Sequence, residues 1–194
     1  NGIGKTTILK CMCGLLIPNK AEIISDKGDL SREDYLNRDI IYVSDEPIYY
    51  HNLTVQEHFW LVCKVENYTQ EEAQKAISFY KNKLHMQEYL NYYPSALSKG
   101  TLQRMMLIMG FLRRKPNLLL DEPFNGLDPV QLEEIIQICD EERKKRCMII
   151  SSHDIESLAE LCDDYIVWGT NGIKVFSGKI DRKAVNQMIG DSYV

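Results

Sequence analysis

The chain of 194 residues is predicted to adopt an α/β fold, with a mostly parallel sheet and helices on both faces. Two observations predict this fold. Short apolar runs of strand length alternate with longer segments in which apolar residues recur at helical spacing. Polar residues follow these runs, at the carboxyl ends of strands, where ligands bind in parallel sheets. Since 44% of the residues are hydrophobic, we expect one compact domain over residues 1–194.

The first half of the chain is expected to contain one strand and three helices. A glycine-rich segment at residues 1–7 leads into an apolar helix that ends near Leu16, with Pro18 just beyond it. The apolar run at residues 40–43 is interpreted as a buried strand. Two pairs at capping-box spacing predict the starts of two more helices: Thr54 with Glu57, and Thr69 with Glu72.

The second half is expected to contain two helices, two buried strands and a hairpin. One helix is predicted to begin near Ser98, and another at Pro129, where Asp128 is a typical cap. The apolar stripe of this last helix is expected to be Leu132, Ile135, Ile136 and Cys139. The buried strands are predicted at residues 118–120 and 148–150, and the antiparallel hairpin at residues 165–168 and 173–176.

Composition argues against several classes of protein. The 23 basic and 28 acidic residues give a net charge of −5, so there is no electrostatic reason to expect a nucleic-acid surface. No apolar run approaches the ~20 residues that a membrane-spanning helix needs. The six cysteines lack the paired spacing of a zinc site, and we interpret them as reduced core residues of a cytosolic protein.

The first seven residues resemble the end of a P-loop, whose full pattern is G-x-x-x-x-G-K-[ST]. The first glycine of that pattern would precede residue 1, so we expect the chain to begin within the loop. Lys5 is expected to reach the β and γ phosphates of a nucleotide, and the Thr6 hydroxyl to bind Mg²⁺. The candidate phosphate-binding residues are Asn1, Gly2, Gly4, Lys5, Thr6 and Thr7.

Two carboxylates follow the predicted strand at residues 118–120. Phosphoryl transfer needs a metal ion and a group that orients the attacking water. Asp121 is expected to help hold Mg²⁺ from its second coordination sphere, and Glu122 to act as the general base. An acidic strand end at the surface is the alternative, but the P-loop segment earlier in the chain favours the catalytic interpretation.

The segment Leu97-Ser98-Lys99-Gly100-Thr101 resembles the signature of ABC transporter ATP-binding domains, usually written L-S-G-G-Q. It lies shortly before the 118–120 strand, as in that family. Ser98 would cap a helix whose N-terminus can face an anion, and Gly100 would permit close backbone approach. The residues alone are also compatible with a plain serine-capped helix.

Further segments match the family in its order. Residues 52–57 resemble the stretch that opens the family's helical subdomain, which we expect at about residues 53–115. Residues 125–129 resemble the D-loop, and His153 resembles the switch histidine that contacts the γ-phosphate. Asp45 stands where the family usually has glutamine, and its carboxylate could still bind Mg²⁺ or water.

The resemblance implies a P-loop NTPase fold and a subunit that binds and hydrolyses ATP with Mg²⁺ to power export of a small molecule, peptide or lipid. It implies transmembrane permease subunits and a second ATP-binding subunit, identical or not, as partners. In the family, each ATP lies between one subunit's P-loop and the other's signature helix. The chain is accordingly expected at the cytoplasmic side of the plasma membrane, as a peripheral protein.

Other members of the same superfamily are the alternatives. A soluble ABC protein that acts on ribosomes usually carries two ATPase domains, and this chain shows one set of motifs. A chromosome or repair ATPase would have a long coiled-coil insertion between the motifs. A nucleotide-binding module without catalysis is disfavoured by Glu122 and His153, although Asp45 leaves room for it.

Overall fold

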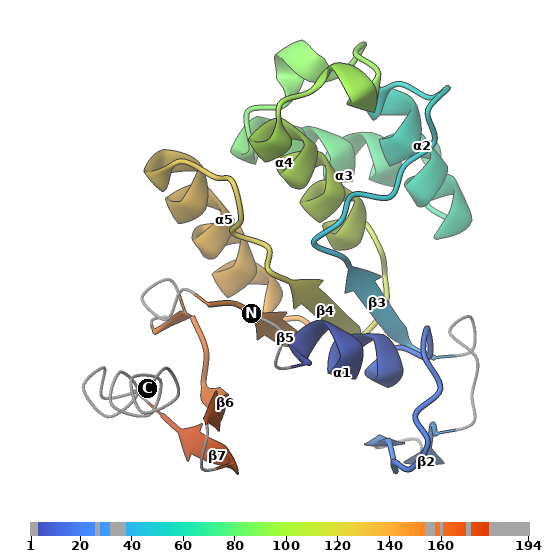
Figure 1. Cartoon of the computed structure of the whole chain (residues 1–194). Coiled ribbons are helices and arrows are strands. Elements are labelled where there is room, and N and C mark those ends of the chain that lie inside the picture. The colour runs from blue at the N-terminus through green and yellow to red at the C-terminus, as the bar shows by residue number, and fades with distance from the viewer. Residues whose placement is uncertain are drawn as a thin grey trace. The chain divides into compact units, whose positions relative to one another are not determined.

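The computed structural model describes residues 4–25, 28–31, 38–153, 158–159, 161–169 and 172–178. The chain divides into two compact units (Figure 1). The larger unit consists of residues 4–151, and the smaller one of residues 152–194 together with residues 1–3. The expectation of a single domain with a helical subdomain at about residues 53–115 stays a prediction.

Among the described residues, the centre of the larger unit is a parallel three-stranded sheet. In spatial order its strands are β3 (Ile40–Val43), β4 (Asn117–Asp121) and β5 (Cys147–Ser151). The leucines of β4 are at most 1% exposed, as expected for a central strand covered on both faces. The register places Asp121 opposite Ser151. The three predicted strands and their parallel arrangement are confirmed.

Helix α1 (Lys5–Met12) covers one face of this sheet. Its buried residue Leu9 and its C-cap Cys13 pack against Ile40 and Leu119. The helix ends at Met12, so the predicted end near Leu16 was wrong. Gly14, at φ +83°, donates its N–H to Cys11 O, and the next N–H goes back to Lys10 O, which is the Schellman arrangement that stops a helix.

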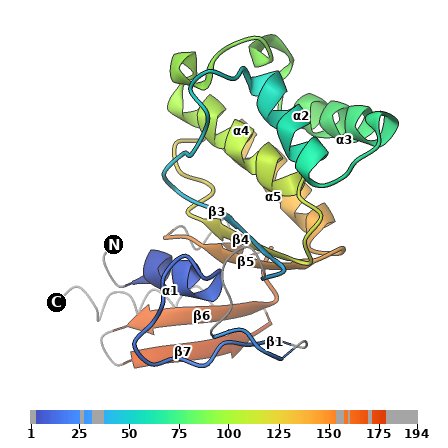
Figure 2. The same cartoon turned by 90° about the vertical axis from the view of Figure 1, so that its right-hand side faces the viewer.

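The opposite face of the sheet carries α4 (Lys99–Phe111) and α5 (Pro129–Glu142) (Figures 1 and 2). Ser98 caps α4 and Asp128 caps α5, as predicted. The buried stripe of α5 differs from the prediction, because Ile138 is buried whereas Leu132 and Ile136 are only half-buried. The spacing therefore predicted the helix correctly, but the set of buried residues differs from the predicted set.

The remaining helices of the larger unit are α2 (Val55–Val65) and α3 (Gln70–Lys83), followed by two short 3₁₀ turns, Gln87–Tyr89 and Pro94–Ala96. Both predicted capping boxes are present, with reciprocal hydrogen bonds between the threonine and glutamate of each pair. Among the described residues, none of the helices combines the length and apolar character needed to cross a membrane.

Two antiparallel ribbons complete the described structure. In the larger unit, β1 (Ile24–Ser25) pairs with β2 (Gly28–Asp29). In the smaller unit, β6 (Asp164–Gly169) pairs with β7 (Gly172–Ser177), which confirms the predicted hairpin, while residues 170 and 171 of its turn lie outside the described residues. The cysteines were only partly predicted, since Cys13, Cys63 and Cys139 are buried but Cys147 is exposed.

Candidate active site

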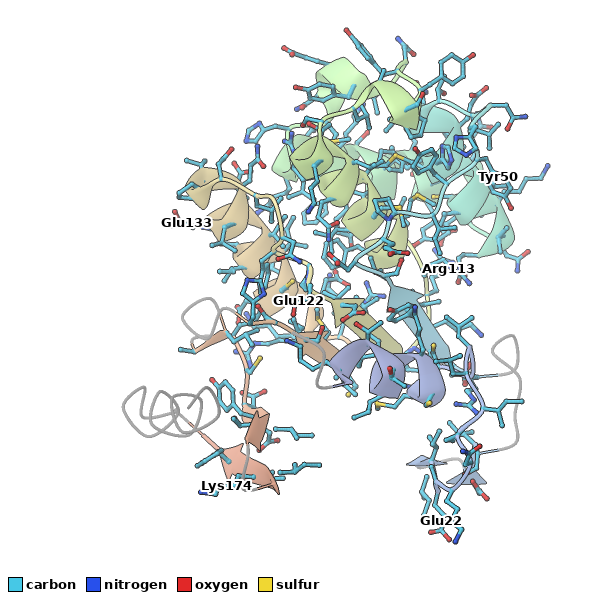
Figure 3. The ribbon with its side chains drawn as sticks, in the orientation of Figure 1. Glu22, Tyr50, Arg113, Glu122, Glu133 and Lys174 are labelled. Carbon is cyan, nitrogen blue, oxygen red and sulfur yellow. The ribbon has the colours of Figure 1, made fainter. Side chains whose placement is uncertain are left out.

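An ion pair joins the first residue of α1 to the residue that follows β4. Lys5 Nζ lies 2.8 Å from Glu122 Oε1, and the two side chains are 20% and 12% exposed. Lys5 is held there because α1 packs along the sheet face and begins at its carboxyl-end edge. Figure 3 labels Glu122 where the chain leaves β4 toward α5. The structure thus brings together two residues that are 117 positions apart and were both predicted for the site.

The backbone of Glu122 has a conformation that L residues rarely adopt. Its φ of +47° lies in the left-handed region, which costs a non-glycine residue roughly 1–2 kcal/mol. The Glu122 N–H donates to both the carbonyl oxygen and the hydroxyl of Ser151, each at 3.0 Å. These bonds from β5 hold the strained residue in place, and strain of this kind is concentrated at functional sites.

Asp121 is a carboxylate buried between two hydroxyl groups. It is 1% exposed, Tyr42 Oη donates to its Oδ2 at 2.9 Å, and Ser151 Oγ donates to its Oδ1 at 2.5 Å. Burial, and then the hydrogen bond to Asp121, raise the pKa of Tyr42 well above its usual range. Among the described residues no lysine, arginine or histidine makes an ion pair with Asp121. A buried carboxylate without a cationic partner suits a site where a metal ion supplies the positive charge.

Two of the residues predicted to hold Mg²⁺ are carboxylates: Asp45, on the segment after β3, and Asp121, at the end of β4. Across the described part of the chain, no three His, Cys, Asp or Glu side chains gather closely enough to hold a metal ion by themselves. Mg²⁺ is usually bound by one or two carboxylates together with substrate phosphates and water, so a full protein cage is not needed. The predicted ligand Asp45 is half-buried and accepts a hydrogen bond from Asn125 Nδ2 at 3.0 Å, which ties the segment after β3 to the segment after β4.

The start of α1 has the features of a phosphate-binding turn. Gly4 precedes the helix at φ +93°, and among the described residues no side chain caps the N–H groups of the first turn. Such N–H groups and the helix dipole together favour an anion. Thr6 and Thr7 are exposed on this turn. Asn1 and Gly2, the other predicted phosphate ligands, lie outside the described residues.

The two signature residues lie at the start of α4. Ser98 is exposed and caps its own helix by accepting the N–H of Thr101 at 3.3 Å. Gly100 is buried, and a Cβ atom there would lie 2.7 Å from Gly126 O, so only glycine fits this close approach. Within the described residues, Ser98 makes no hydrogen bond or ion pair with Lys5. The signature start therefore contacts the segment after β4 of its own chain.

His153 belongs to the smaller unit, two residues beyond β5, and its side chain is exposed. Its predicted role toward the γ-phosphate stays a prediction.

Sequence reasoning did not assign a role to Tyr42 or Ser151, the two residues that hold Asp121. A signal for both exists in the sequence, because each is a hydroxyl residue at or near the end of an otherwise apolar strand. On a parallel sheet, the side chains of Tyr42, Asp121 and Ser151 share one face, since the side-chain period is two.

Comparison with known proteins agrees with these features. The family model described as ABC transporter matches residues 1–125. The chain is 28% identical over 169 residues to the ABC-type transporter ATP-binding protein EcsA of Bacillus subtilis, covering 86% of this chain and 68% of that protein. It is 30% identical over 194 residues to an uncharacterized ABC transporter ATP-binding protein of Alkalihalophilus pseudofirmus, covering 97% of this chain and 71% of that protein.

A larger relative and a solved structure extend the comparison. The mouse glucosylceramide transporter ABCA12 is 29% identical over 165 residues, which are 84% of this chain and 6% of that protein. The solved structure of an ATP binding subunit of an ABC transporter has a TM-score of 0.80 at 23% identity, covering all of this chain and 80% of that one. The latter likeness shows that the fold is the same.

Proposed function

We propose that this chain, which belongs to the ABC transporter family, binds ATP and hydrolyses it to power the export of a small molecule, peptide or lipid. The observation that carries the proposal is the 2.8 Å ion pair between Lys5 and Glu122 beside the buried Asp121. These are a cation, a base and a metal-binding carboxylate, which are the groups that phosphoryl transfer needs. Export as the direction rests on the resemblance of three segments to those of exporters: Glu46-Pro47, residues 52–55, and the L-S-K-G form of the signature at residues 97–100.

In the proposed reaction, Lys5 and the N–H groups at the start of α1 bind the β and γ phosphates. Thr6 and Asp45 would hold Mg²⁺, with Asp121 acting from its second coordination sphere, and the ion would neutralise the charge that develops on the phosphoryl oxygens. Phosphate oxygens would compete with Glu122 for the single charge of Lys5. Glu122, once released from that pair, takes a proton from the attacking water.

The test of the hydrolytic role is Glu122→Gln, with Glu133→Gln on the exposed surface of α5 as the matched control. Glu122→Gln should keep ATP binding and lower turnover by about 10²-fold or more, because the amide cannot act as a base. Glu133→Gln should hydrolyse ATP like the wild type. Equal turnover of Glu122→Gln and wild type would remove the basis of the proposal.

We further infer that the protein works as a pair of ATP-binding subunits joined to membrane subunits, at the cytoplasmic face of the membrane. The support is the family, together with the exposed position of Ser98 at the start of α4. If each ATP is shared, a mixture of Lys5→Ala and Ser98→Arg subunits should recover activity that neither has alone. Mixed pairs that form but stay inactive would contradict the shared site.

A further inference from the structure

Ser151 lies at the carboxyl end of β5, directly opposite Asp121 in the sheet, and is 8% exposed. Its hydroxyl donates to Asp121 Oδ1 at 2.5 Å and accepts the Glu122 N–H at 3.0 Å. A serine hydroxyl has one proton to donate and two lone pairs to accept with, so both bonds can exist at once. One side chain thus links the carboxylate of Asp121 to the backbone of Glu122.

The bond from Glu122 to Ser151 lies at a residue whose backbone conformation is unfavourable. At φ +47°, Glu122 needs partners that keep it out of the extended conformation of the preceding strand. Both groups that accept its N–H, the hydroxyl and the carbonyl oxygen, belong to Ser151. The two bonds from Ser151 therefore contribute to the direction in which the Glu122 side chain leaves β4, toward Lys5, together with the bond from the Asn125 N–H to Glu122 O.

The bond to Asp121 is complemented from the strand on the other side of β4. Tyr42 on β3 donates to Asp121 Oδ2 at 2.9 Å, so each carboxylate oxygen has one donor from a different strand. A rotation of the carboxylate would break both bonds. Each oxygen still keeps a lone pair, because a carboxylate offers about four acceptor positions. The plane of the carboxylate is thereby fixed, while it can still accept from a metal-bound water.

We propose that Ser151 is a positioning residue for hydrolysis, which sets the carboxylate of Asp121 and the backbone of Glu122 with a single hydroxyl. The inference rests on the proposed function, because it assigns Asp121 to the metal ion and Glu122 to the attacking water. Ser151 touches neither substrate nor metal in this account and acts only through its two neighbours. Its loss should therefore leave nucleotide affinity nearly intact and misplace the groups that act on the γ-phosphate.

The test compares Ser151→Ala, Ser151→Thr and the surface control Ser95→Ala with the wild type in the full-length protein. Three quantities are measured: kcat and KM for ATP, the melting temperature, and the Mg²⁺ concentration at which ATP gives half of its full thermal shift. Ser151→Ala should lower kcat about 10- to 100-fold, as a misplacement of the reacting groups does, with KM within about twofold. Its Mg²⁺ midpoint should rise several-fold.

Ser151→Thr keeps the hydroxyl and suits a strand, so it should restore most of kcat and the Mg²⁺ midpoint. Ser95→Ala, which changes an exposed serine, should match the wild type in all three quantities. The inference would be overturned if Ser151→Ala kept the wild-type kcat and Mg²⁺ midpoint. It would also be overturned if the alanine and threonine variants lost kcat equally and both had a lowered melting temperature, because the loss would then be a loss of stability. If the wild type does not hydrolyse ATP, the proposed function fails, and the Mg²⁺ midpoint still decides the role of Ser151.

Discussion

Two buried carboxylates of the larger unit have opposite surroundings. Asp121 is 1% exposed and Glu142 is 2% exposed. Asp121 accepts hydrogen bonds from two hydroxyls, whereas Glu142 makes ion pairs with Arg146 and Lys145 and also accepts the Tyr80 hydroxyl at 2.8 Å. Asp121 is the last residue of β4 and Glu142 the last residue of α5, and burial alone does not distinguish them.

The difference lies in what compensates each charge. A buried carboxylate is costly unless it is paired and hydrogen-bonded. Glu142 is compensated by cations of its own chain, and Arg146 also donates to the carbonyl oxygens of Phe111 and Arg113. This cluster connects three helices: α3, the end of α4, and α5. Its role is therefore structural. Among the described residues Asp121 has no such cation, and the proposed function assigns its charge to the metal ion that binds together with ATP.

Removal of the compensating cation should give the largest effect on stability. Arg146→Ala leaves the charge of Glu142 buried with only Lys145 and Tyr80, and we expect the free energy of unfolding to fall by about 3 kcal/mol. Lys145→Ala is the control, because Lys145 is 61% exposed and should cost under about 1 kcal/mol. Urea unfolding of both variants measures this. Equal costs would contradict the division of roles within the cluster.

Replacing the tyrosine beside each carboxylate with phenylalanine gives a matched pair of variants, whose effects on stability should be intermediate in size. Tyr80→Phe and Tyr42→Phe each remove one hydrogen bond to a buried carboxylate, and each should cost about 1.5 kcal/mol of unfolding free energy. Only Tyr42→Phe should also lower the kcat of ATP hydrolysis, by about tenfold, because the proposed function assigns Asp121, and not Glu142, to the reaction. A comparable loss of kcat in Tyr80→Phe would show that the two sites are not functionally distinct.

At low pH, Glu142 should have a smaller effect on the stability of the fold. Burial opposes its ionisation, but the hydrogen bond from Lys145 and the charge of Arg146 prevail, so the pKa of Glu142 lies below its ordinary value of 4.5. A carboxyl whose folded pKa is lowered stabilises the fold above its unfolded pKa and loses that contribution as the pH falls through the folded pKa. The stability of Glu142→Gln should therefore fall less steeply below about pH 4.5 than that of Glu133→Gln. Parallel acid curves would contradict this.

Much of the fold could be predicted because its signals are local. The capping boxes at Thr54 and Thr69 and the cap at Asp128 involve residues three positions apart or fewer. The strands were recognisable as short apolar runs. The end of α1 was missed because the apolar pattern continues through Leu15 and Leu16, although Gly14 had already reversed the backbone.

The site was only partly predictable for a physical reason. The P-loop segment, Asp121 and Glu122 stand in recognisable patterns, and the structure brings Lys5 to Glu122. The contacts of Tyr42 and Ser151 with Asp121 depend on the strand register, which joins residues 79 and 30 positions apart. Gly100 was expected to approach a nucleotide, which stays a prediction, and its close approach to Gly126 O within the chain was not predicted.

The central claim is that the charge of Asp121, which has no cationic partner among the described residues, serves a metal ion that binds together with ATP. Asp121→Asn tests it most directly, because the amide can still accept from one hydroxyl and donate to the other. The measurement is the thermal melt of wild type and variant without ligand, with ATP and EDTA, and with ATP and Mg²⁺.

Without ligand, the variant should be as stable as the wild type to within about 1 kcal/mol, because a satisfied neutral group replaces a buried charge. The wild type should gain more stability from ATP with Mg²⁺ than from ATP with EDTA, since a ligand stabilises the state that binds it. The variant should gain equally from both. A variant that keeps the full Mg²⁺-dependent gain, or that loses several kcal/mol without ligand, would show that Asp121 serves the fold and not the metal.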